Sequence, residues 1–224
     1  FNKEYGPVKQ AVSDSGFLSS QNGAVNWFSP LHPTNQGWVF TLPFFVERTA
    51  IGYAQTFVYS PSAQEAILNV GGYGSLKVWV NDKLLDAYQV KCHLNQGYNR
   101  VLVQIGYTGN VVSPNFIVRL TDNQFTALGN IKCTSAPQPY IADASKTAPE
   151  QIIRFAEAYF LDQIKKHPND LAYRFCLSRV YIRNQAYEKA KQVYNVLYDK
   201  AADNPFIANY YSDCLSPQFE NTRI

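Results

Sequence analysis

The sequence has no methionine, few charged residues and no long apolar run, and these absences narrow the class of protein. Charged residues make up 17% of 224 positions, below the roughly 25% of an ordinary soluble domain. A net charge of +3, without a long Lys/Arg cluster, argues against a nucleic-acid partner. No apolar run approaches the roughly 18 residues of a membrane span. Because the chain starts at Phe1 without a charged-then-apolar leader, we expect a processed or internal start.

Recognisable catalytic and cofactor motifs are also missing. The sequence holds no G-x-S-x-G, H-E-x-x-H, P-loop or dinucleotide fingerprint. The Gly-rich stretch GGYG, residues 71–74, joins two expected strands, so it lacks the helix N-terminus that phosphate binding needs. We therefore expect no enzyme activity, no cofactor and no metal site.

The four cysteines fall as two in each half, Cys92 and Cys133 first, then Cys176 and Cys214. The absence of a C-x-x-C pair argues against zinc. Two interpretations stay open. One is a pair of disulfides in an exported protein, with Cys92–Cys133 the stronger candidate, and the other is buried free thiols.

What the first half does contain is a series of short segments rich in β-branched and aromatic residues, each bounded by Gly, Pro, Asn or Asp. No long helical pattern intervenes, so we expect an antiparallel β-sandwich or jelly roll. The expected strands are residues 37–42, 53–59, 65–70, 75–80, 84–90, 100–106 and 115–121.

The clearest local pattern is residues 75–85. In LKVWV, residues 76–80, Leu76, Val78 and Val80 share one face of the strand and alternate with Lys77 and Trp79. The pair Asn81-Asp82 follows directly. Asn and Asp tolerate the positive φ angles that both central residues of a type I′ turn adopt. The pattern predicts a two-residue hairpin here.

Three stretches carry a family resemblance: EAILNVGGYGSLKVWVNDKLL, LNQGYNRVLVQIGY and FIVRLTD. Together, over roughly residues 37–122, they resemble the galactose-binding-like β-sandwich, most closely the sugar-binding type found in family 2 glycoside hydrolases. The chain has Asn81-Asp82 where Asn-Gly is usual in this family, and Gly97-Tyr98-Asn99 where the family pattern has Gly-x-Asn at the start of a later strand. In those hydrolases this domain does not hold the catalytic carboxylates, so the resemblance implies a non-catalytic module.

The pattern changes near residues 134–149, where three prolines stand among small polar residues. We expect the sandwich over 1–135, a linker over 136–148 and helices over 149–224. Thr147 and Glu150, three residues apart around Pro149, predict a capped helix start.

The helical half resembles tetratricopeptide repeats. Leu177, Ser178, Tyr181, Ala190 and Tyr194 stand at the offsets of the repeat signature W-x2-L-G-x2-Y, then A-x3-F. The match is degenerate, because neither the Trp nor the Gly of the signature is present. One full repeat flanked by two partial ones is expected, and about three repeats are needed for a stable stack. Either the first helix packs onto the β-sandwich, or, as we favour, further repeats follow Ile224.

Two groups of binding residues follow. Carbohydrate binding needs an exposed aromatic ring beside amide or carboxylate groups, whereas Trp38 and Trp79 are more simply read as packing residues. The ligand-binding candidates are Trp27, Tyr73, Asn81 and Asp82. On the first repeat helix, Tyr173, Arg174 and Arg179 are candidates for contacting a partner protein.

The sequence thus favours a non-catalytic scaffold or protein-interaction segment of a larger bacterial envelope or secreted protein. Its partners would be a protein or neighbouring domains, and its location extracytoplasmic: periplasm, cell surface or medium. The alternative is a carbohydrate-binding accessory module of a larger enzyme.

Overall fold

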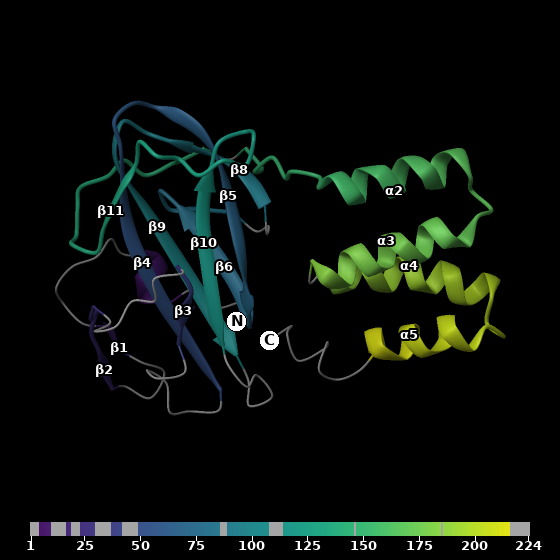
Figure 1. Ribbon diagram of the computed structural model, residues 1–224. Helices are drawn as coiled ribbons and strands as arrows, with labels where there is room; N and C mark the ends of the chain where they lie inside the picture. The colour runs from purple at the N-terminus through teal and green to yellow at the C-terminus, as the bar shows by residue number, and fades with distance from the viewer. Residues whose placement is uncertain are drawn as a thin grey trace. The chain divides into compact units, whose positions relative to one another are not determined.

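The chain folds into two compact units, and the first gives way to the second between Gln151 and Ile152 in the sequence (Figure 1). The structure is a computed structural model, and it describes residues 5–9, 17–18, 23–29, 37–41, 49–85, 89–107, 114–145, 147–184 and 186–215. The first unit is made of strands and the second of helices.

The first unit contains two larger antiparallel sheets. The four-stranded sheet has the order β3 (Val39–Phe40), β10 (Asn115–Thr121), β5 (Gln64–Tyr73), β8 (Gln89–Leu94). The five-stranded sheet has the order β11 (Lys132–Thr134), β4 (Ala50–Ser60), β9 (Gly97–Tyr107), β6 (Ser75–Val80), β7 (Lys83–Leu84). A short helix and a two-stranded sheet accompany them: α1 (Gly6–Lys9), β1 (Phe17–Leu18) and β2 (Ala24–Val25).

The core of this unit lies between the two larger sheets. Leu68, Val90 and Phe116 from the four-stranded sheet join one buried cluster with Val58 and Val103 from the five-stranded sheet. Burial of such side chains contributes about 1.5–3 kcal/mol each. The expected antiparallel β-sandwich is therefore confirmed.

The hairpin expected at Asn81 and Asp82 is present. Both residues have positive φ, 51° and 67°, and Val80 pairs with Lys83 across the turn. Two positive φ values are what a type I′ turn requires, because its twist then matches that of the strands. The expected single strand 84–90 is wrong: β7 ends at Leu84, and β8, which begins at Gln89, belongs to the other sheet.

The segment expected to be a linker, 136–148, is bound to the sandwich instead. The Tyr140 hydroxyl donates to Asp82 at 2.9 Å, and the Asp143 N–H donates to the Asn81 carbonyl at 2.6 Å. Further on, Gln151 forms an isolated antiparallel bridge with Val90 on the edge of β8. An extended chain that pairs with a strand edge covers unpaired backbone groups of that edge.

That pairing also explains why the expected capped helix start near residue 147 is wrong. The Glu150 carbonyl accepts the Lys91 N–H at 2.9 Å, so this stretch is extended. The first long helix begins later, at Phe155, and its N-cap residue, Arg154, makes no side-chain capping bond.

The second unit stacks four helices in chain order, α2 (Phe155–Lys166), α3 (Leu171–Arg183), α4 (Tyr187–Lys200) and α5 (Pro205–Leu215) (Figure 1). Every repeat-signature position named above is buried, and Ala190 and Tyr194 are 0% exposed. A small residue at Ala190 lets α4 approach α3 closely, while the Tyr194 ring packs 6.3 Å from that of Phe175. The expected helical hairpins are present, and their membership of the tetratricopeptide family stays a prediction.

Candidate functional site

The four-stranded sheet turns one face away from the core, and this face carries polar and aromatic side chains. Phe116, Val118 and Leu120 of β10 pack inward, so the residues that alternate with them point outward. The same alternation holds on β5 and β8. We call the outward-facing set Phe40, Asn69, Tyr73, Gln89, Asn115 and Arg119 the aromatic–amide face.

Two exposed rings stand at one end of the aromatic–amide face. Phe40 pairs with Asn115, and Asn115 pairs with Tyr73, so the two rings flank one asparagine. Phe40 is 42% exposed and Tyr73 66% exposed. Neighbouring strands lie about 4.8 Å apart, and β10 lies between β3 and β5. The strands that carry Phe40 and Tyr73 are therefore about 10 Å apart.

Gly72 allows the strands beneath these rings to come together. A Cβ atom there would lie 2.2 Å from the Asn115 carbonyl oxygen and 2.8 Å from the Phe116 Cα. No side chain fits at this position without moving the backbone. Residues 71–73 of the Gly-rich stretch therefore belong to β5, and Gly72 contributes to the site by allowing close approach of β10.

Hydrogen-bonded amides occupy the other end of the face. The Gln89 Nε2 donates to Asn69 Oδ1 at 2.5 Å, and the Asn69 Nδ2 donates to Thr121 Oγ1 at 3.0 Å. Arg119 pairs with Asn69 in the strand register and is exposed. No local sequence pattern identifies Asn69, Gln89 and Arg119 as site residues, because only strand register brings their three distant segments into one row.

Asn81 and Asp82 are not part of this face. Asn81 is 1% exposed; its Nδ2 donates to Asn99 Oδ1 at 2.7 Å, and its Oδ1 accepts the Arg100 N–H at 3.0 Å. They follow the end of β6, whereas Tyr73 precedes its start, a separation of about 20 Å along the strand. The Asn81 side chain thus holds the turn together, and ligand binding by Asn81 and Asp82 stays a prediction.

Asp82 instead belongs to a cluster around the buried Arg100, whose side chain is 1% exposed. The Arg100 Nη1 donates to Asp82 Oδ1 at 3.0 Å, its Nε to Gln55 at 3.3 Å, and its Nη2 to the Pro7 carbonyl at 2.6 Å. Burial and the hydrogen bond to Asp82 raise the pKa of Tyr140, which joins the same carboxylate. The cluster ties α1 and the 136–145 stretch to the hairpin turn.

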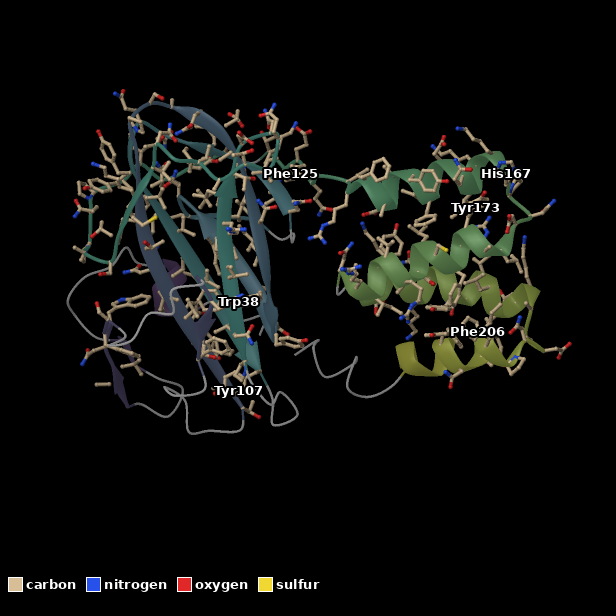
Figure 2. All side chains as sticks on the ribbon, viewed as in Figure 1. Trp38, Tyr107, Phe125, His167, Tyr173 and Phe206 are labelled. Carbon is tan, nitrogen blue, oxygen red and sulfur yellow. The ribbon has the colours of Figure 1, made fainter. Side chains whose placement is uncertain are left out.

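The three tryptophans have different surroundings. Trp79 is 3% exposed in the sandwich, as its interpretation as a packing residue requires. Trp38 is half-buried beside β3 (Figure 2). Trp27, the ligand candidate, is half-buried in the stretch after β2 and lies outside the strands that form the aromatic–amide face.

The partner-binding candidates lie on α3. The Tyr173 ring is 5.8 Å from that of His167, and both are labelled in Figure 2. Arg174 is half-buried and donates to the Pro168 carbonyl at 3.4 Å. Arg179 is exposed, and its guanidinium carbon lies 4.5 Å from the centre of the Tyr210 ring on α5, a cation–π distance.

The predicted Cys92–Cys133 disulfide is not formed, and both residues are free thiols. Cys92 points into the core from β8, whereas Cys133 lies on β11, an edge strand of the other sheet. Burial raises the pKa of Cys92 to about 12. Cys176 is also a free thiol, and the side chain of Cys214 lies outside the described residues.

Two further kinds of feature, a metal-binding cluster and a membrane-spanning helix, are absent from the described residues. No group of three or more His, Cys, Asp or Glu side chains in this part of the chain could hold a metal ion. None of the described helices is long and apolar enough to span a bilayer.

No protein-family model and no curated protein matches the chain. Among solved structures, it is similar to the β-glucosidase of Kluyveromyces marxianus, at 20% identity over 49% of this chain with a TM-score of 0.31. The structure of the same enzyme in complex with glucose matches at 16% identity over 56% of this chain, with a TM-score of 0.33. In both cases the match covers 16% of the enzyme. A family 35 carbohydrate-binding module from an environmental isolate gives 16% identity over 56% of this chain and 92% of the module, with a TM-score of 0.31. Overlaps of this size do not assign the chain to a family.

Proposed function

We propose that this chain is a non-catalytic, extracytoplasmic segment that binds carbohydrate on the aromatic–amide face of its sandwich. The observation that carries the proposal is the pair of exposed rings, Phe40 and Tyr73, on either side of Asn115. Sequence patterns alone favour the scaffold function, whereas exposed rings beside hydrogen-bonded amides favour carbohydrate binding.

The chemistry of the face suits a sugar. A pyranose ring has an apolar side formed by C–H groups, which stacks on an aromatic ring, and a rim of hydroxyls that need hydrogen-bond partners. Tyr73 offers an aromatic ring for the apolar side of the sugar. Asn69 and Gln89 offer amide groups for the hydroxyls. Their mutual hydrogen bond orders both amides before a ligand binds, which lowers the entropy lost on binding.

The test is a glycan array followed by titration calorimetry with the whole chain. We expect Tyr73→Ala to lower the affinity for a bound glycan by about tenfold, because covering the apolar surface of the ring is worth about 1.5 kcal/mol. Tyr59→Ala is the matched control, since Tyr59 is also exposed but lies on the five-stranded sheet. Binding that survives Tyr73→Ala, or an array without any bound glycan, would reject the proposal.

A second candidate function is protein binding by the helical unit, the activity that tetratricopeptide-like hairpins would supply. The observation that favours it is an aromatic surface across α3 and α5. Phe206 is 56% exposed, its ring lies 5.3 Å from that of Phe175 and 4.8 Å from that of Tyr210, and Arg179 stacks on Tyr210 (Figure 2). Exposed aromatic and Arg side chains are the residues most enriched at interface hot spots.

This candidate predicts that the whole chain retains a specific protein from its native source and loses it in Phe206→Ala. The control is Phe125→Ala, which removes a similarly exposed ring, 51%, from the sandwich unit. Equal retention by both variants would reject the role of the α3–α5 surface.

A further inference from the structure

Arg119 is an exposed cation on the aromatic–amide face that no described residue neutralises. In the described part of the chain, no salt bridge and no side-chain hydrogen bond involves the Arg119 guanidinium. Its nearest acidic neighbour in sequence, Asp122, accepts the N–H groups of Gln124 and Thr126 at 2.9 Å with its Oδ1 and holds that turn.

The other charges on this side of the sheet are compensated locally. The Lys91 ammonium lies 2.6 Å from the Glu150 carboxylate, and His93 lies 2.7 Å from Glu65. Arg119 therefore carries the one positive charge of the face that has no counter-charge among the described residues.

Arg119 also stands at the right place to contact a ligand bound on the rings. Tyr73 and Asn69, the register partners of Asn115 and Arg119, are four residues apart on β5, or about 13 Å. Gly71 and Ile117 lie between the two rows. The Ile117 Cγ2 lies 3.5 Å from where a Gly71 Cβ would stand, so an apolar surface connects the two rows. An extended ligand longer than one sugar ring can reach from Tyr73 to Arg119.

The described hydrogen bonds leave the polar end of the face ready to accept such a ligand. Gln89 donates to Asn69 through its Nε2, and its Oε1 has no partner among the described residues, so that oxygen can accept a hydroxyl proton. A guanidinium fork offers two parallel N–H donors, which match a carboxylate.

We infer that the aromatic–amide face binds a glycan that carries carboxylate groups, with a uronate carboxylate on Arg119, hydroxyls on Gln89 and a sugar ring on Tyr73. This inference rests on the proposed carbohydrate-binding function and names its ligand class. A protein partner fits less well, because an interface hot spot needs a dry apolar centre. A nucleic acid would need several cations along its backbone.

The experiment is calorimetric titration of the whole chain with trigalacturonate and with a neutral galactose trisaccharide. We expect trigalacturonate to bind more tightly, and Arg119→Gln to weaken it about 10- to 100-fold, as expected for loss of a hydrogen-bonded charge contact. Arg119→Lys keeps the charge but loses the paired donors of the guanidinium. Its affinity for trigalacturonate should therefore lie between those of the original chain and Arg119→Gln. Binding of the neutral trisaccharide should be the same in Arg119→Gln as in the original chain.

Arg183→Gln is the matched control, because it removes an exposed arginine from the helical unit. Far-ultraviolet circular dichroism verifies the fold of each variant. Equal affinity for the acidic and neutral trisaccharides, with no effect of Arg119→Gln, would overturn the carboxylate inference while leaving carbohydrate binding intact. An equal loss in Arg183→Gln, or equally tight binding of a sulfated trisaccharide, would also overturn it. Failure of every glycan would remove the proposed function itself.

Discussion

The buried Arg100 cluster gives the sharpest stability prediction. Arg100→Met keeps an unbranched side chain of similar reach but removes the guanidinium and its bonds to Asp82, Gln55, Tyr140 and Pro7. The Pro7 carbonyl then loses its donor in a buried position, which costs about 1–3 kcal/mol.

The rest of the loss depends on how far water can replace the lost partner. Breaking a fully buried ion pair costs about 3–5 kcal/mol. The Asp82 side chain is 35% exposed, so its charge regains part of its hydration. We therefore expect the free energy of unfolding to fall by about 3 kcal/mol, at the lower end of that range.

Urea unfolding followed by tryptophan fluorescence measures this loss. All three tryptophans precede Ile152, so the signal reports the sandwich unit and not the helices. Lys91→Met is the control, because its partner Glu150 is exposed, and exposed pairs contribute about 0–1 kcal/mol. A loss in Arg100→Met no larger than in the control would refute the cluster as a tie between the three segments.

Three more predictions concern the sandwich. Gly72→Ala should destabilise it by about 2 kcal/mol or more in the same assay, because the new Cβ meets the Asn115 carbonyl, whereas Gly129→Ala, which meets nothing within 4 Å, should be neutral. At pH 8, Ellman's reagent with peptide mapping should label the exposed Cys133 before Cys92, because a pKa of about 12 leaves about 10⁻⁴ of the Cys92 thiol ionised. Rapid labelling of Cys92 would contradict its burial. Tyr140→Phe should cost about 1 kcal/mol at neutral pH. The pKa of Tyr140 is raised in the folded state, so its contribution should be complete below about pH 10 and lost above it; a gap between the variant and the original chain that widens with alkaline pH would show the opposite sign.

Local patterns predicted a large part of this fold. The alternation along residues 75–80 and the Asn81-Asp82 pair specify a hairpin by themselves, because the φ preferences of two turn residues are properties of those residues. The helical hairpins were equally accessible, since apolar spacing along a helix is local. The two failures, the strand 84–90 and the helix start near 147, have tertiary causes. In the first, β8 pairs with β5 of the other sheet, and in the second, Glu150 and Gln151 pair with the edge strand β8.

Residue patterns along the chain place strands before helices and show, for residues 76–80, which side chains share one face of a strand. The candidate site depends on how distant strands pair. Tyr73 was a candidate from its type alone, whereas Asn69, Gln89 and Arg119 join it through the register of β5, β8 and β10. Asn81 also shows an effect of the tertiary structure. A turn that would be exposed in an isolated hairpin is buried here, where its side chain bonds to Asn99 and to the Arg100 N–H. Periodicity depends on neighbours along the chain, whereas a binding face depends on which distant strands hydrogen-bond side by side.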